Sequence, residues 1–60
     1  MPNPAPEDVY RPSPGARCIR AVDGLAATVV EYDDTADSFL LQYDEGGGGW
    51  WPAGSIVEEV

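Results

Sequence analysis

The sequence has no histidine, no lysine and a single cysteine, Cys18. One cysteine excludes a disulfide within the chain. Without histidine, neither a Cys/His zinc site nor a Ser/His or Cys/His catalytic pair can form. No apolar run approaches the roughly 20 residues that a membrane span needs, and the N-terminus lacks the basic start and apolar core of a signal peptide. We therefore expect a cytoplasmic protein without metal, cofactor or membrane contact.

Positive charge is also scarce, because three arginines stand against eleven aspartates and glutamates, for a formal net charge of −8. Nucleic-acid binding requires cations that neutralise phosphates, so we expect no direct contact with nucleic acid. An acidic surface favours a protein or peptide partner with a basic surface. The alternative is that the acidity only keeps a small domain soluble. Sixty residues allow one domain, and we expect a monomer.

Residues 1–14 contain five of the six prolines. Proline removes a backbone donor and fixes φ, so this segment cannot form a helix or a central strand. We expect an extended, disordered tail that the fold can do without. Val9 and Tyr10 are its only large apolar residues and the only candidates for docking on the folded part.

Residues 15–60 alternate between short β-type runs and turns. Strands are predicted at 16–22, 26–32, 38–43, 50–53 and 56–60. Asp23-Gly24 predicts a tight turn with Gly24 at positive φ. The glycines at 46–49 predict a flexible hairpin loop, and 54–55 a tight bend. With no helical period longer than a turn, the pattern indicates an all-β fold: a small, five-stranded, antiparallel, partly open barrel.

Short motifs in this region carry a resemblance. They are Gly15-x-x-Cys18, Asp23-Gly24, Ala27-Thr28-Val29, and Leu41-Gln42-Tyr43 before a glycine turn. Together they resemble SH3-like barrels of the Tudor type. The resemblance implies five bent antiparallel strands and a role as a binding module.

Methyl-ligand Tudor domains build an aromatic cage from several loops, and this chain departs from that pattern. The end of the first strand holds Val22, and the segment past Asp-Gly holds residues 25–26, none of them aromatic. Tyr43 matches a cage residue, with Trp50 or Trp51 as candidate replacements. Cation–π attraction beside an acidic rim is the physics that such a cage uses.

Residues 50–56 are also similar in pattern to the SH3-like type II dihydrofolate reductases. Those enzymes form a tetramer around a central pore and use a Val-Gln-Ile-Tyr run just before the proline. Gly-Gly-Trp-Trp stands at 48–51 in this chain. The motif that carries the activity is absent, so we expect no enzyme and no catalytic residues.

Several other features have ordinary structural interpretations. The acidic residues at 33, 34, 37, 44 and 45 lie in turns, where aspartate bonds its own backbone, and their spacing does not fit a calcium loop. Cys18 is expected in the core. Strand alternation places Arg17 and Arg20 on opposite faces, which argues against an activated thiolate.

The predicted binding surface consists of Tyr43, Trp50 and Trp51 with the acidic residues Asp44 and Glu45. Adjacent strand residues point to opposite faces, so only one tryptophan can enter the core. By analogy with both related families, the residue before the proline faces the partner. This predicts Trp51 outward and Trp50 inward.

The sequence therefore predicts a non-enzymatic module that binds a protein or peptide through an aromatic surface on an acidic barrel. The alternative is an acidic decoy, such as a phage-type inhibitor, that occupies the nucleic-acid-binding surface of another protein. A tetramer of the type II reductase kind comes third. Salt separates the first two, because only the decoy should lose affinity steeply as salt rises.

Overall fold

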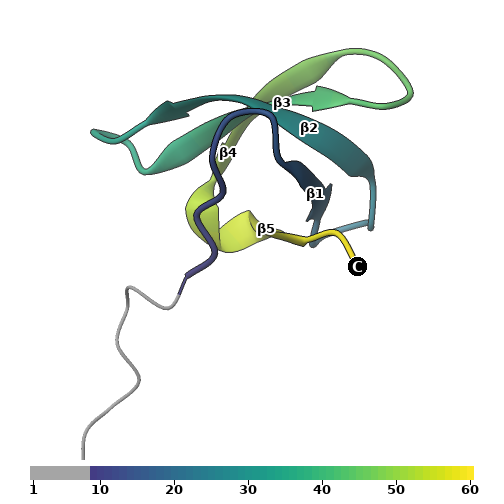
Figure 1. Cartoon of the computed structure of the whole chain (residues 1–60), viewed down its shortest axis with the longest axis horizontal. Coiled ribbons are helices and arrows are strands. Elements are labelled where there is room, and N and C mark those ends of the chain that lie inside the picture. The colour runs from purple at the N-terminus through teal and green to yellow at the C-terminus, as the bar shows by residue number, and fades with distance from the viewer. Residues whose placement is uncertain (1–8) are drawn as a thin grey trace, which may run out of the picture.

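A computed structural model describes residues 9–60, which form five antiparallel strands in one sheet (Figure 1). The strands are β1 (Arg17–Arg20), β2 (Ala26–Asp33), β3 (Ser38–Tyr43), β4 (Gly48–Pro52) and β5 (Ile56–Glu58). Their order is β4-β3-β2-β1-β5, and the sheet does not close, so β4 and β5 are its edges. The predicted all-β class, with five antiparallel strands in a partly open arrangement, is confirmed. Within these residues, no helix has the length and apolarity to cross a membrane.

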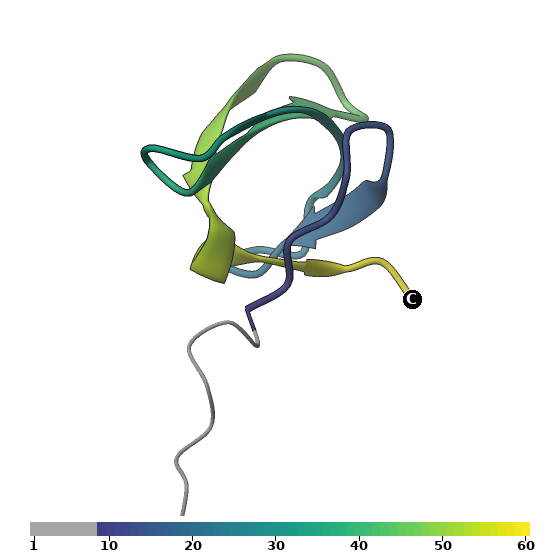
Figure 2. The same ribbon diagram turned by 60° about the vertical axis from the view of Figure 1, so that its left-hand side comes forward.

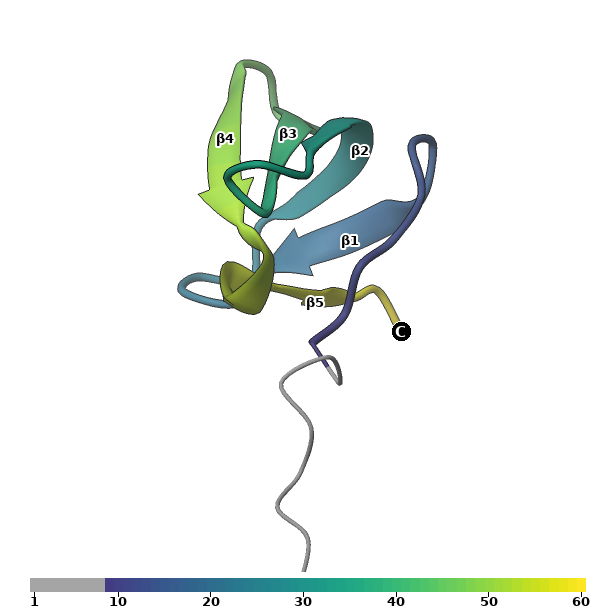
Figure 3. The same ribbon diagram turned by 90° about the vertical axis from the view of Figure 1, so that its left-hand side faces the viewer.

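The sheet curls so that its strands surround a common interior (Figure 2). A single 3₁₀ turn, η2 (Ala53–Ser55), carries the chain from β4 at one edge to β5 at the other (Figure 3). Side chains alternate along each strand, so every strand sends one set of residues to the interior and the other to solvent. We call these two sides of the sheet the inner face and the outer face.

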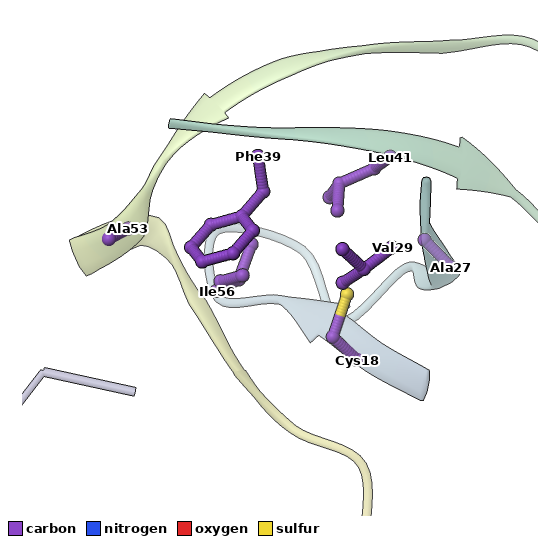
Figure 4. Close-up of a cluster of buried hydrophobic side chains, with 7 residues drawn as sticks. All are labelled: Cys18, Ala27, Val29, Phe39, Leu41, Ala53 and Ile56. Carbon is purple, nitrogen blue, oxygen red and sulfur yellow. The ribbon is translucent and has the colours of Figure 1, made fainter. Parts of the chain in front are cut away.

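The inner face carries the hydrophobic core (Figure 4). The buried residues are Cys18, Ala27, Val29, Phe39, Leu41, Ala53 and Ile56. Phe39 and Tyr32 pack ring against ring, with centroids 4.6 Å apart. Each fully buried large side chain contributes about 1.5–3 kcal/mol, so a core this small depends on every member. The expected core position of Cys18 is confirmed, and burial raises the pKa of its thiol.

The β1–β2 turn contains Asp23 and Gly24 as predicted but is longer, because β1 ends at Arg20 and not at Val22. Gly24 has φ +75°, a conformation that glycine adopts at little cost, and its N–H donates to the Arg20 carbonyl at 2.7 Å. The Asp23 carboxylate accepts the N–H of Leu25 at 3.2 Å. The prediction of positive φ at Gly24 is confirmed.

The glycine run divides between a turn and a strand. Gly46 and Gly47 have φ of +113° and +80° and make the β3–β4 turn. Gly48 and Gly49 are strand residues paired with Gln42 and Leu41, so the prediction of a loop over 46–49 is wrong for its second half. A Cβ at Gly48 would lie 2.2 Å from the Leu41 carbonyl oxygen. Glycine is needed there because the two strands approach closely.

Val9, the first described residue, lies inside the segment that the prolines mark as a tail. Val9 and Tyr10 pack against the core, and the Tyr10 hydroxyl donates to the Arg17 carbonyl at 3.4 Å. Arg11 forms two hydrogen bonds to the Asp37 carboxylate, at 3.0 and 2.6 Å. These contacts attach residues 9–11 to the barrel. The rest of the predicted tail, residues 1–8, lies outside the described residues.

Candidate binding surface

Tyr43 and Trp51 both lie on the inner face, Tyr43 as the last residue of β3 and Trp51 as the fourth residue of β4. Trp51 is paired across the strands with Phe39, and Tyr43 with Ala27, both of which are core residues. The Trp51 Nε1–H donates to the Tyr43 hydroxyl at 2.7 Å, and both side chains are partly buried. The hydrogen bond holds the two rings in a fixed arrangement at the rim of the core.

Arg20 fills the place that this aromatic pair offers to a cation. Its guanidinium carbon lies 4.7 Å from the Tyr43 ring centroid and 4.8 Å from that of Trp51. Two nitrogens of the guanidinium also donate to the Asp23 carboxylate, which lowers the pKa of Asp23. The Arg20 side chain is only 16% exposed. An external cation could enter only by displacing it, so the protein's own arginine occupies the place that this aromatic pair offers to a cation.

Trp50 lies on the opposite face of the sheet and is 49% exposed. Trp51 is partly buried, so the prediction of Trp51 outward and Trp50 inward is wrong, and the two are exchanged. The cause is the register of β4, which pairs Trp51 with buried Phe39 and Trp50 with Leu40. A residue shares its face with its cross-strand partner, so the core position of Phe39 determines that of Trp51.

Trp50 belongs to a row of side chains across the outer face. It is paired with Leu40 on β3, and Leu40 is paired with Glu31 on β2. Trp50 and Glu31 are exposed and Leu40 is partly exposed. The next row toward the end of β4 consists of Pro52, Ser38 and Asp33. Apolar groups on β4 and β3 are thus bordered by two carboxylates on β2, and we call these two rows the Trp50 surface.

β2 bends where it enters this surface. Its register with β3 shifts between Val29 and Glu31, which leaves Val30 as an extra residue that is 46% exposed. A bulge of this kind increases the local twist of a strand. It also allows Val29 to remain in the core while Glu31 lies on the outer face beside Leu40.

Asp44 and Glu45, the acidic members of the predicted site, differ in their contacts. Arg17 donates to both carboxylate oxygens of Asp44, at 2.6 and 2.5 Å, and also contacts Glu59 at 3.2 Å. The Arg17 hydrogen bonds lower the pKa of Asp44. Glu45 is exposed and makes no ion pair with any residue in the described part of the chain. Arg17 lies on the outer side and Arg20 on the inner side, as alternation predicts.

All three arginines are engaged in ion pairs. Arg11 pairs with Asp37, Arg17 with Asp44 and Glu59, and Arg20 with Asp23. Within residues 9–60, the carboxylates of Glu31, Asp33, Asp34, Glu45 and Glu58 are exposed and in no ion pair. The charge that an approaching molecule meets is therefore almost entirely negative.

The acidic turn residues do not converge. The turn at 34–37 and the turn at 44–47 lie at opposite ends of β3, and no group of three metal-ligating side chains occurs among residues 9–60. Asp33 accepts the backbone N–H of Thr35 at 3.0 Å, as aspartate in a turn commonly does. The described surface has no pocket.

The structure thus divides the predicted site. Tyr43 and Trp51 form one unit on the inner face, Trp50 lies on the outer face, and Asp44 and Glu45 follow β3 in the turn to β4. Sequence reasoning did not find Arg20, Leu40 or Glu31 as members of these surfaces. Alternation along β3 is a signal for Leu40, because it places Leu40 on the face opposite Phe39. For Glu31 the same rule gives the wrong face, because the bulge after Val29 reverses the phase of β2.

Comparison with protein-family models, curated proteins and solved structures finds no match to this chain.

Proposed function

We propose that this chain is a small SH3-like, Tudor-like interaction module that binds a basic segment of another protein, with Trp50 as its apolar anchor. Five antiparallel strands in one open sheet support the barrel part of the proposal. The observation that supports a binding role is Trp50 itself. It is half exposed on the edge strand β4 and is paired with Leu40 on β3. Tryptophan is among the residues that most often dominate the binding energy of interfaces.

Trp50 has no structural role that requires its exposure. The core is complete on the inner face without it, whereas Trp51 already provides the indole that packs there. A large apolar side chain left in water gains nothing for folding, and an apolar group bordered by polar residues is typical of a contact site. The Trp50 surface is therefore the part of the described molecule that best fits a partner.

Charge defines the chemistry of that partner. Glu31 and Asp33 lie on β2, on the same outer face as Trp50 and separated from it by β3, and all three arginines are held in ion pairs. A lysine or arginine of the partner would gain both the carboxylates and the face of the Trp50 ring, since cations are attracted to indole faces. A negatively charged partner would meet repulsion and no unpaired cation.

The experiment is affinity capture from lysate of the source cells with three baits: the natural chain, Trp50→Ala and Val57→Ala. Val57 is a matched control because it is 46% exposed but lies on β5, the other edge. Trp50→Ala should keep its thermal midpoint within a few degrees and lose the partner, and Val57→Ala should keep both. If the Trp50→Ala bait captures the same partner at the same yield, Trp50 is not the anchor.

An acidic decoy is the second candidate, and the engagement of every arginine is the observation that favours it. Such a protein would occupy a nucleic-acid-binding surface by presenting carboxylates alone. Measuring the affinity for the captured partner from low to high salt distinguishes the two functions. A decoy loses affinity steeply, whereas an interface anchored by Trp50 loses little. Only the module should also lose its partner in Trp50→Ala.

A further inference from the structure

The free edge of β4 has the features of a strand that can accept another strand. β4 is last in the sheet order, so within residues 9–60 no strand lies beyond it. Its residues Gly48–Pro52 carry no charged side chain, and two of them have no side chain at all. Sheet proteins usually protect edges with charges, bulges or very short strands. β5, the other edge, has three residues and ends in Glu58.

The register shows which backbone groups face that edge. Tyr43 N–H donates to the Gly47 carbonyl at 2.9 Å, and Ala53 N–H donates to the Asp37 carbonyl at 2.9 Å. Hydrogen-bonded and non-hydrogen-bonded pairs alternate along an antiparallel ladder. Between these two bonds, Gly49 and Trp51 therefore face β3 with their backbone groups. The N–H and C=O groups of Gly48 and Trp50 point away from β3, and Pro52, which has no N–H, ends the series.

We propose that the β4 edge binds an extended basic segment of the partner by strand addition, which makes it the sixth strand of the sheet. The inference rests on the proposed function and specifies its mode of binding. Gly48 and Trp50 would supply the backbone hydrogen bonds. Backbone pairing of this kind gives affinity, and the alternate side chains give specificity.

The geometry also assigns the partner's side chains. The partner residue opposite Trp50 would share its face, because directly opposed residues of an antiparallel pair lie on the same side of the sheet. It would extend the row Glu31–Leu40–Trp50, so a lysine or arginine there would lie against the indole. The Glu31 carboxylate is three strand spacings away on β2, roughly 14 Å, and attracts that cation only at long range. The residues between would lie on the inner side, beside Gly49 and Trp51, where apolar side chains fit. An alternation of basic and apolar residues is the matching pattern.

A second copy of this chain is a poorer occupant. Each copy carries a formal charge of −8, so two copies repel at ordinary salt, and β4 offers no cation to offset the repulsion. The exposed carboxylates instead favour a strand with positive charge.

The test uses short peptides of alternating lysine and valine, measured by calorimetry against the full-length chain. Three versions are compared: unmethylated, N-methylated at the lysines, and N-methylated at the valines. Strand addition with lysine opposite Trp50 requires the lysine N–H groups to face β4 and the valine N–H groups to face away. N-methyl-lysine should therefore weaken binding by about tenfold or more, and N-methyl-valine should change it little. Hydrogen exchange at the Gly48 and Trp50 amides should slow only with the unmethylated and N-methyl-valine peptides, with Glu58 as the unaffected control.

Equal binding of the two methylated peptides would overturn strand addition and leave the proposed function standing, provided that capture still depends on Trp50. Weaker binding of the N-methyl-valine peptide would overturn the assigned register. Two further results would overturn the proposal. One is that the unmethylated peptide does not bind. The other is that the Trp50 amide already exchanges slowly in the chain without peptide, because two copies of the chain pair through β4. Loss of Trp50 dependence in the capture experiment would remove the proposed function itself.

Discussion

Replacing Gly48 with alanine tests the close approach of β3 and β4, on which both proposals depend. The added Cβ would lie 2.2 Å from the Leu41 oxygen and 3.3 Å from its carbonyl carbon. Ordinary van der Waals contact begins near 3.4 Å, so the Cβ of alanine and the Leu41 oxygen must move apart by roughly 1.2 Å, the difference between 3.4 and 2.2 Å. The two strands must separate locally by about this distance. Strand hydrogen bonds have N···O distances of about 2.9 Å and do not survive such a displacement. The neighbouring pair, Leu41 and Gly49, would lose its bonds.

The expected cost follows from these displacements. Forcing extra atoms into a packed site costs about 1–3 kcal/mol, and each lost hydrogen bond about 0.5–1.5 kcal/mol. Alanine restricts the unfolded chain and returns about 0.4–1 kcal/mol. We expect a net loss of about 3 kcal/mol, the middle of the range that these values give for one added methyl group and two lost hydrogen bonds. For a domain of this size, that corresponds to a fall in thermal midpoint of roughly 12–24 °C.

Thermal and urea unfolding, followed by tryptophan fluorescence, measure the effect. Gly54→Ala is the matched control, because no atom lies within 4 Å of the added Cβ and the residue does not have positive φ. The control should stay within about 0.5 kcal/mol of the natural chain. If Gly48→Ala is as stable as Gly54→Ala, the two strands are not as close as described, and the alternation that directs Trp50 outward loses its support.

Three further predictions concern the ion pairs and the N-terminal segment. Arg20→Lys keeps the charge but should lower the thermal midpoint, because an ammonium cannot make the two-nitrogen contact with Asp23 or stack on the two rings. Added methylguanidinium should not restore the midpoint, since the lysine side chain still occupies the site. The pKa of Asp44 is lowered in the folded chain, so its ion pair contributes full stability above the ordinary aspartate pKa of about 3.9. This contribution is lost as the pH falls through the pKa of Asp44 in the folded chain. The difference in unfolding free energy between the natural chain and Asp44→Asn should therefore shrink from pH 7 to pH 3. At pH 7, Glu45→Gln, which removes the same charge from a residue without an ion pair in residues 9–60, should lower the thermal midpoint less than Asp44→Asn does. Deleting residues 1–14 should lower the thermal midpoint below that of a chain lacking only 1–8, because Val9, Tyr10 and Arg11 contact the barrel; equal midpoints would show that these contacts add nothing.

Local features of the sequence were sufficient to predict much of the fold. β3 has the predicted bounds, Ser38–Tyr43, because large apolar residues recur at every second position, Phe39, Leu41 and Tyr43, and turns flank it on both sides. Gly24 has the predicted positive φ because Asp-Gly is a strong turn signal. Each of these depends on residues that are neighbours in the chain, and neighbours are what a sequence shows directly.

The faces of Trp50 and Trp51 could not be read in the same way. A one-residue shift in strand register exchanges the two faces of a strand. The four consecutive glycines at 46–49 allow the turn to form at several positions, so the sequence leaves the phase of β4 open. Only the long-range pairing of Trp51 with Phe39 decides it. The analogy with related families supplied the opposite answer, because the residue before a proline has no fixed facing of its own.

The arginines link the stability of this small fold to its proposed partner. Arg11 joins the N-terminal segment to the turn before β3, and Arg17 joins β1 to Asp44 and to Glu59 beyond β5. Arg20 joins the β1–β2 turn to the two rings on β3 and β4. Each guanidinium thus connects separate segments of a fold whose core is small. Because these contacts engage every arginine, the surface left to a partner is acidic. A basic strand at the β4 edge would be attracted by exposed carboxylates that no arginine of the chain already pairs with.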